Sequence, residues 1–278
     1  GGRETEYLEL IKVQSLTTIN LFEGIDTSWK RLPGGGPVGA ILEKVEAEFN
    51  FADPGVHLPA LLQAWKILEG LEDSHWKRLK SEELRALIAG VAGLFMEATT
   101  ASPMAVPGSP VEVTLELVNR NPKQVRLRQV RLDAGTQLDT LLALGNNVRH
   151  ELSLMLRVPE KQEWTGPYWL RSPASLGTYE IPSADLIGKP ETPAAFQAHV
   201  ALEVEGVPLT FDLPVIHRYA EPDQGERYRS FNIVPPVTAS FGETVKIFAN
   251  DHGQPLRVQV KSQTEKASGQ IRLDVPEG

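Results

Sequence analysis

The chain has 278 residues, of which 41% are hydrophobic and 23% charged, a composition that favours a buried core and argues against extensive disorder. The net charge of -8, from 28 basic and 36 acidic residues, argues against general nucleic-acid binding, which needs a dense basic surface. The absence of cysteine excludes disulfides, thiolate metal ligands and cysteine nucleophiles, and no apolar run approaches the ~20 residues of a membrane span.

The first residues hold neither a methionine nor the basic and apolar pattern of a signal peptide. Gly1-Gly2-Arg3 reads as a processed or recombinant end, so we expect a piece of a longer protein. The following stretch, LFEGIDTSWKRLPGGG, combines Asp26, Trp29 and Arg31 with three glycines. Asp26 is suited to capping a short turn and Trp29 to anchoring it. The same three side chains are our candidates for a binding site or a contact between domains.

Three helices are predicted before residue 102. The first covers Val38 to Phe49, which has apolar residues at helical spacing. The second starts after Asp53-Pro54 and stops at Gly70. The third is predicted to start at Ser81 and to carry an apolar stripe that ends at Leu94 and Phe95.

Strands are predicted after a proline-rich linker over residues 99–110. Runs with a period of two cover 111–117, 125–132 with one slip of register, 152–158, 198–204 and 209–215. Several short strands without helices between them are typical of an antiparallel immunoglobulin-like sandwich. Further runs at 245–248, 256–260 and 271–275 resemble half of a second sandwich. We therefore predict an α+β chain with a helical segment (1–102), a sandwich (103–223) and a partial second β module (224–278).

Motifs for catalysis are weak in this sequence. The six histidines form no HxH, HxxxH or HExxH pattern, and neither a GxSxG elbow nor a GxxxxGK[ST] phosphate loop occurs. We therefore predict no catalytic residue, no metal site and no cofactor in this chain. If the chain were an independent hydrolase with a dispersed site, Asp26 with His57 or His75 would be the first candidates.

A second group of candidate binding residues lies in EWTGPYWLRSPASLGTYEI, residues 163–181. It holds four of the ten Trp and Tyr residues in the chain, together with a basic side chain. Aromatic faces stack on sugar rings and bury well at protein interfaces, and they also plug the ends of sandwiches. The candidate binding residues here are Trp164, Tyr168, Trp169, Arg171 and Tyr179.

Three stretches together resemble the region downstream of the catalytic domain in long bacterial PIG-L/LmbE-type deacetylases: INLFEGIDTSWKRLPGG, GPYWLRSPASLGTYEI and RYRSFNIVPPVTASFGETVKIFAN. The resemblance covers nearly the whole chain. It implies a non-catalytic accessory region with immunoglobulin-like modules, in an exported, periplasmic or envelope-associated enzyme that removes acetyl groups from N-acetylglucosamine-type sugars. The family's H-P-D-D zinc motif is absent, so the resemblance assigns zinc to a catalytic domain outside this sequence and no catalytic residue to this chain.

The resemblance also sets the expected partners, which are that catalytic domain and a glycan, while the charge and the short apolar runs argue against nucleic acid and a membrane span. Two alternatives stay open beside it. One is an independent hydrolase with a dispersed site. The other is an interaction scaffold whose aromatic cluster docks another protein or the catalytic domain.

Overall fold

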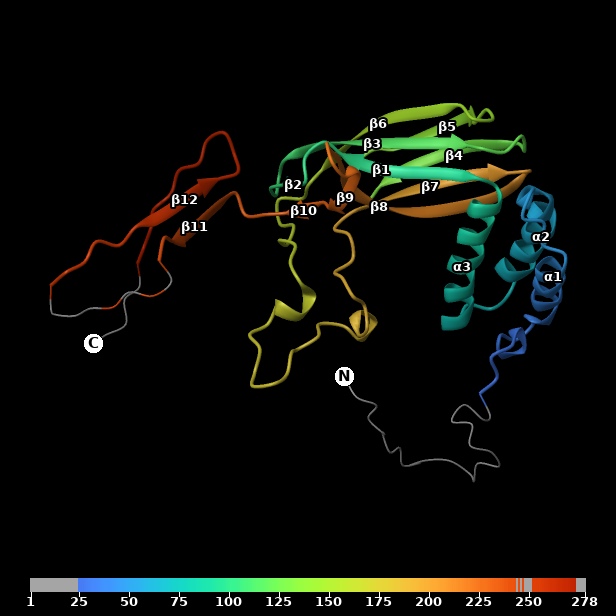
Figure 1. The fold of residues 1–278 in the computed structure, drawn as a ribbon, viewed down its shortest axis with the longest axis horizontal. Helices are drawn as coiled ribbons and strands as arrows, with labels where there is room; N and C mark the ends of the chain where they lie inside the picture. The colour runs from blue at the N-terminus through green and yellow to red at the C-terminus, as the bar shows by residue number, and fades with distance from the viewer. Residues whose placement is uncertain (1–24, 244, 246, 248–251, 274–278) are drawn as a thin grey trace, which may run out of the picture. The chain divides into compact units, whose positions relative to one another are not determined.

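The computed structural model describes residues 25–243, 245, 247 and 252–273 as an α+β protein with helices first and strands afterwards (Figure 1). The chain divides into two compact units, a helical unit (Gly1–Ile88) and a β unit (Ala89–Gly278). Within the described ranges, no helix is long and apolar enough to cross a membrane. Leu21 to Gly24 of the first candidate stretch lie outside the described residues.

The helical unit is built on α1 (Gly36–Ala47), α2 (Leu58–Glu69) and most of α3 (His75–Val91). Helix α1 begins two residues before its predicted start, with Pro37 in its first turn, where the missing N–H costs nothing. The predicted Asp53-Pro54 start is instead a short 3-10 turn, η2 (Pro54–His57), which leads into α2. Gly70 ends α2 as predicted, and six residues of this helix are buried: Leu58, Leu61, Leu62, Ala64, Trp65 and Leu68.

The third helix differs from its prediction at both ends. It begins at His75, and the Ser74 hydroxyl accepts a hydrogen bond from the Lys77 amide at 3.1 Å, so Ser74 and not Ser81 is at the start. The helix ends at Val91, and the predicted end of its stripe, Leu94, opens strand β1 (Leu94–Thr100). Leu94 and Phe95 were assigned to the helical stripe because short apolar runs fit both the helical and the strand period.

The main sheet of the β unit has eight strands. Seven follow the order β5-β4-β7-β8-β1-β3-β6, and β9 pairs with the far end of β8. Their bounds are β1 (Leu94–Thr100), β3 (Pro110–Asn119), β4 (Val125–Leu132), β5 (Gln137–Ala143), β6 (Arg149–Arg157), β7 (Gln197–Val204), β8 (Val207–Glu221) and β9 (Gly225–Ser230). All neighbours are antiparallel except β1 and β8, which are parallel.

The predicted slip of register in the second strand is a β-bulge. The pairing of β4 with both β5 and β7 shifts between Leu127 and Gln129, so that Val130 and Leu132 return to the buried face. The buried side chains of β3, β4, β7 and β8 form a continuous apolar core that includes Leu115, Leu127, Val200 and Phe211.

Strand β8 is what joins the two halves of the sheet. Its first part pairs with β7, from Val207 to Pro214, and the next three residues pair with β1. The β4–β5 turn also reaches β6, where the Thr136 amide donates to the Met155 carbonyl at 3.2 Å. Only a glycine fits at position 135, because a Cβ there would lie 2.5 Å from the Met155 carbonyl oxygen. The sheet is therefore curved and partly closed.

The predicted C-terminal module begins later than residue 224. Strand β9 belongs to the main sheet, and β10 (Asn232–Ile233) pairs with β2 (Met104–Ala105). Among the described residues after β10, the regular structure is one hairpin, β11 (Val237–Phe241) with β12 (Val258–Ser262). The predicted strand over 245–248 lies partly outside the described residues, as does the one over 271–275, whose described part is irregular.

Candidate functional site

The first candidate stretch forms a tight turn in the helical unit. The Asp26 carboxylate accepts hydrogen bonds from the Ser28 amide at 2.8 Å and from the Ser28 hydroxyl at 2.7 Å. These bonds hold the pKa of Asp26 below its usual range, helped by the charges of Lys30 and Arg31. Ser28 in turn caps the 3-10 turn η1 (Trp29–Arg31) by accepting from the Lys30 amide at 3.2 Å. Asp26 thus acts on the backbone of this turn.

Trp29 and Arg31 meet helix α3. The guanidinium carbon of Arg31 lies 3.6 Å from the ring centroid of Trp76, and the Lys80 ammonium lies 5.9 Å from that of Trp29. Gly39 of α1 allows Trp29 to pack closely, because a Cβ at that position would lie 2.8 Å from the Trp29 Cβ. We call this arrangement the tryptophan corner; it surrounds a hollow of about 170 Å³ lined by Thr27, Ser28, Trp29, Arg31, Leu32, Trp76 and Lys80.

The second candidate stretch lies on the connection 158–196 between β6 and β7, which is held by hydrogen bonds to β10 and within the connection itself. The Thr165 amide donates to the Ile233 carbonyl at 2.9 Å, and the Thr165 hydroxyl accepts from the Ile233 amide at 3.0 Å. Tyr168 is buried, and its hydroxyl donates to the Lys189 carbonyl at 2.8 Å. Its amide donates to the Thr192 hydroxyl at 3.1 Å. This segment, although irregular, is therefore anchored by specific bonds.

A hollow of about 290 Å³, the loop hollow, opens beside this anchored segment. Trp169 lines it and packs edge-on against Tyr168, with ring centroids 4.9 Å apart. The other lining residues are apolar or polar, with one carboxylate among them: Thr165, Gly166, Pro167, Pro190, Glu191, Thr192, Pro193, Ala194, Ala195, Ser230, Phe231 and Asn232. An indole ring beside hydroxyl, amide and carboxylate groups suits a sugar ring, whose faces are apolar and whose edges bond to polar groups.

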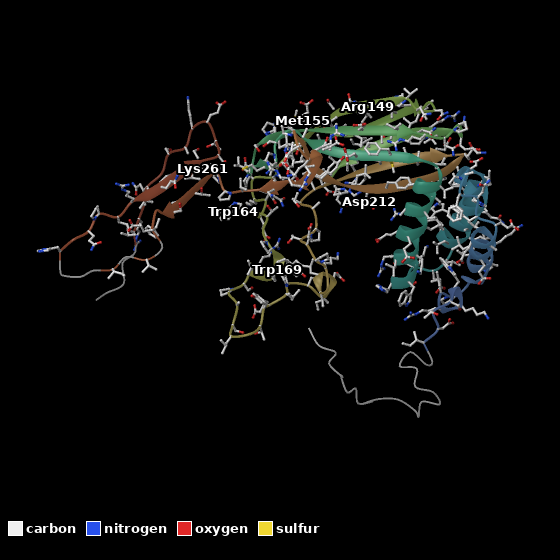
Figure 2. All side chains as sticks on the ribbon, in the orientation of Figure 1. Arg149, Met155, Trp164, Trp169, Asp212 and Lys261 are labelled. Carbon is white, nitrogen blue, oxygen red and sulfur yellow. The ribbon has the colours of Figure 1, made fainter. Side chains whose placement is uncertain are left out.

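The structure separates the other three candidates from this hollow. Trp164 and Tyr179 are 59% and 57% exposed and do not line it. Arg171 pairs with Glu163 at 3.2 Å, on the surface. Figure 2 shows Trp164 where the connection leaves the sheet and Trp169 farther along it. Of the five residues predicted there, Trp169 lines the hollow and Tyr168 packs against its ring.

Sequence reasoning missed the partners that shape the loop hollow. Phe231 and Asn232 lie far away in sequence and join it because β10 runs beside the connection, where the Thr165 hydroxyl donates to the Asn232 side-chain oxygen at 3.0 Å. Thr192 also supports the loop, donating to the Gly166 carbonyl at 2.9 Å. Threonines and asparagines in turn-rich segments carry no signal that separates such anchors from ordinary loop residues.

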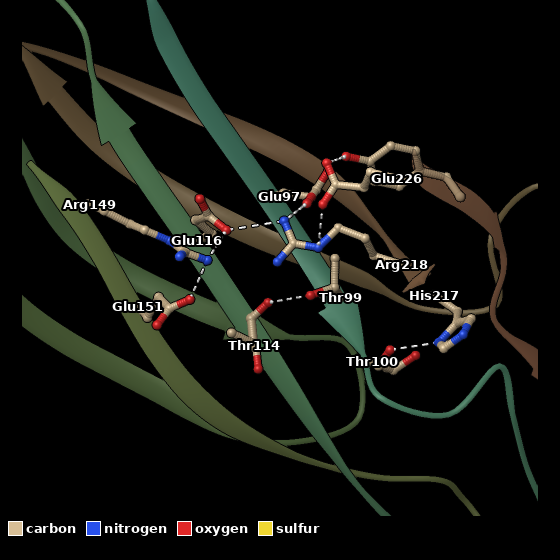
Figure 3. Close-up of polar contacts among 11 residues, drawn as sticks. Glu97, Thr99, Thr100, Thr114, Glu116, Arg149, Glu151, His217, Arg218 and Glu226 are labelled. Carbon is tan, nitrogen blue, oxygen red and sulfur yellow. Dashed lines mark hydrogen bonds and ion pairs between the residues drawn. The ribbon is translucent and has the colours of Figure 1, made fainter. Parts of the chain in front are cut away.

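A chain of ion pairs crosses the main sheet over β6, β3, β1, β8 and β9 (Figure 3). The Arg218 guanidinium contacts Glu97 at 2.9 Å, Glu116 at 3.2 Å and Glu226 at 3.3 Å. Arg149 contacts the same Glu116 at 2.8 Å, and this bond raises its pKa above the usual value. Every one of these charges is paired, so the cluster serves cohesion of the strands and leaves little free binding capacity.

The side chain of Tyr228 ends that chain of pairs. Its hydroxyl donates to Glu226 at 3.0 Å. Partial desolvation of the hydroxyl and the neighbouring carboxylates raise the pKa of Tyr228 to about 12. The phenol therefore stays protonated at neutral pH and acts as a hydrogen-bond donor, which is unlike the lowered pKa of an activated base.

His199 bridges two carboxylates. Its Nε2 lies 2.8 Å from an Asp133 oxygen and its Nδ1 2.6 Å from an Asp212 oxygen. Partial burial lowers the pKa of His199, but the two carboxylate hydrogen bonds outweigh it, and the net effect is a raised pKa. Both ring nitrogens are occupied, so this imidazole links β7 to β8 and to Asp133, the residue that follows β4.

The dispersed acid–base site proposed for a hydrolase is not assembled in the described part of the chain. Asp26 bonds to Ser28, the His57 Nε2 accepts from the Asn50 amide at 2.9 Å, and His75 packs against Trp76. Over the same ranges, no group of three or more histidine, aspartate or glutamate side chains is placed to hold a metal ion.

Comparisons with known proteins give little guidance. No family model matches the chain, and no curated protein matches it. Among solved structures, it is similar to the Pseudomonas fluorescens alkylpurine DNA glycosylase AlkC bound to DNA containing an abasic site analog, with 10% sequence identity and a TM-score of 0.22. The match covers 62% of this chain and 50% of that chain, so the chain spans about half of its length. A likeness this low carries no argument about fold or function.

Proposed function

We propose that this chain is a non-catalytic accessory region of a bacterial PIG-L/LmbE-type deacetylase that acts on N-acetylated sugars. In this role it supports or targets a zinc-dependent catalytic domain, which supplies the chemistry, in an exported or envelope-associated enzyme. The proposal starts from the sequence resemblance over three stretches. The observation that carries its binding part is the loop hollow, where Trp169 stands beside anchored polar groups.

The order of strands supports the immunoglobulin-like part of the proposal. In sandwiches of this kind one sheet contains strands A, B and E, and the other contains C, F and G, with an added C′ in variable-type domains. Taking β1 as A, β3 as B and β6 as E gives the first sheet, and β5-β4-β7-β8 corresponds to C′-C-F-G. The parallel contact of β1 with β8 would then join the two sheets at their edges.

The loop hollow fits a weak glycan contact better than a deep substrate pocket. The Thr165 and Thr192 hydroxyls are engaged in holding the loop, which leaves Glu191 and Ser230 as the lining groups with the most freedom to bond a ligand. One half-buried indole with few free polar groups is the arrangement expected of a surface that holds one or two sugar units.

The scaffold alternative has an observation of its own. The connection 158–196 exposes six large apolar side chains by 37% or more: Trp164, Leu170, Leu176, Tyr179, Ile181 and Ile187. Exposed apolar side chains gathered on one segment often mark a protein contact. In that case the connection would dock the catalytic domain, and Trp169 would only support it.

The first experiment combines metal analysis of the purified chain with an assay for acetate release from N-acetylglucosamine and chitobiose. We expect substoichiometric metal and no acetate. Stoichiometric zinc with turnover would overturn the accessory role and establish an independent hydrolase.

The second experiment separates targeting from docking with Trp169→Ala, using Trp164→Ala as the matched control outside the hollow. Binding of chito-oligosaccharides and of a separately expressed deacetylase domain are both measured. Loss of sugar binding in Trp169→Ala alone supports targeting. Intact sugar binding with lost docking, in particular in Trp164→Ala, would favour the scaffold.

A further inference from the structure

We propose that the tryptophan corner binds a sugar that carries a carboxylate, such as a hexuronate, through the guanidinium of Arg31. This site lies in the helical unit and is separate from the loop hollow. The inference therefore does not depend on the proposed function.

The group on which the proposal depends is the Arg31 guanidinium, whose N–H donors form no ion pair among the described residues. Arg31 is exposed and stacks on Trp76 at 3.6 Å, and no carboxylate within the described ranges forms an ion pair with it. Stacking fixes the plane of the guanidinium and leaves its N–H edges available, a geometry that matches the two oxygens of a carboxylate. An arginine that served only packing would gain from a partner acid, and Asp26, whose carboxylate interacts with the charge of Arg31, is hydrogen-bonded to Ser28 instead.

The charges around the hollow favour a monoanion. Lys80 lines it as a second cation, but its ammonium is shared with Glu83 at 2.6 Å. The Asp26 carboxylate, whose pKa is affected by Arg31, adds a negative charge close by. Within the described part of the chain Arg31 is unpaired, and the charge of Lys80 is partly neutralised by Glu83. This distribution of charge suits a single carboxylate better than a doubly charged phosphate.

The walls of the hollow favour a ring attached to that carboxylate. Trp29, Trp76 and Leu32 are apolar, and the Thr27 hydroxyl has no hydrogen-bond partner among the described residues. A sugar presents an apolar face of C–H groups and hydroxyls at its edge, which complement such walls. A volume of about 170 Å³ is below the ~300–1,000 Å³ of drug-sized pockets, which limits the ligand to a single ring.

The test is a titration of the ¹⁵N-labelled full chain, following its five tryptophan indole N–H signals by NMR. The probes are D-glucuronate, D-glucose, acetate, glutamate and inorganic phosphate. We expect D-glucuronate to shift the signals of Trp29 and Trp76 saturably in the millimolar range, and the other probes to bind at least about tenfold more weakly.

Variants locate the site. Arg31→Gln is expected to weaken D-glucuronate binding by about tenfold or more, and Arg31→Lys by nearly as much because the fork is lost. Lys80→Gln provides a second variant if the Arg31 changes perturb folding, with an expected loss of a few-fold. The matched control is Arg78→Gln, on the same helix as Lys80. The Arg78 side chain pairs with Asp73 and does not line the hollow.

Several results would overturn the inference. Shifts confined to Trp169 would place the ligand in the loop hollow. Equal binding of D-glucose would remove the role of the carboxylate, and equal binding of acetate or glutamate would remove that of the ring. Tighter binding of phosphate, an equal loss in Arg78→Gln, or no saturable shift with D-glucuronate would each exclude the site as described.

Discussion

The main sheet and the C-terminal hairpin have similar alternating apolar sequences, but the apolar side chains are buried in the sheet and exposed in the hairpin. In β3 the alternate residues Val113, Leu115 and Leu117 are fully buried. In the hairpin, Val237, Ala239 and Phe241 alternate in the same way and share one face with Val258 and Val260, yet every residue of both strands is exposed. The same period of two describes both.

The difference shows that alternation of apolar and polar residues gives a strand one apolar face. The strand is stabilised only where another surface covers that face. The apolar side chains of each strand in the main sheet pack against those of neighbouring strands and against residues across the curve of the sheet. A two-stranded hairpin with an uncovered apolar face is marginal in water by itself. We expect the sheet to contribute nearly all of the stability of the β unit.

The largest contrast should come from truncating one apolar residue in each region. Leu115→Ala empties a fully buried position in β3 and should lower the free energy of unfolding by about 2–5 kcal/mol. Val260→Ala removes a side chain that is 49% exposed and should cost less than about 0.5 kcal/mol. Urea unfolding monitored by circular dichroism measures both. Equal losses would mean that the hairpin face is covered in solution.

A smaller contrast should come from adding one methyl group to a glycine in each region. Gly135→Ala would place its Cβ against the Met155 carbonyl and force the β4–β5 turn away from β6, at a cost of about 1–3 kcal/mol. Gly269→Ala, in the C-terminal segment, meets no atom within 4 Å and should change little. Thermal unfolding distinguishes them, and a neutral Gly135→Ala would show that the turn does not close the sheet.

The smallest effect concerns pH. The pKa of His199 is raised in the folded sheet above 6.5, so its stabilising contribution is full below pH 6.5 and is lost as the pH rises through the folded value. His199→Gln should remove this contribution to the pH dependence, which we expect to be about 1 kcal/mol or less for a side chain that is still partly exposed to solvent. Unfolding at pH 6 and pH 8.5 measures it.

The sequence predicted those parts of the fold whose pattern is local. The apolar spacing placed α1 and α2 within a few residues, and the broken alternation around Gln129 corresponded to a real bulge. Strand β5 was missed because Leu138, Leu141 and Leu142 do not alternate, and β1 because Leu94 and Phe95 extend the stripe of α3. The parallel contact of β1 with β8 has no local signal.

The candidate site was predictable only where its members are neighbours in sequence. Asp26, Trp29 and Arg31 do form one corner, but Trp76 and Lys80, which complete it, come from a helix whose start was misplaced. Tyr168 and Trp169 meet edge to edge, whereas Trp164, Arg171 and Tyr179 lie apart from the loop hollow. Clustering along the chain therefore located the segment, and the packing of distant elements decided which side chains share a hollow.

The joining of β1 to β8 has a consequence for how the chain acquires its structure during synthesis. Thr100 and His217, which meet across this pair, are 117 residues apart in sequence. Until β8 leaves the ribosome, β1 has a partner only in β3, and its other edge stays open. Closing so long a loop is slow, because its entropy must be lost before the contacts form. The nascent β unit is thus most exposed to strand exchange with other chains just before its last long strand arrives.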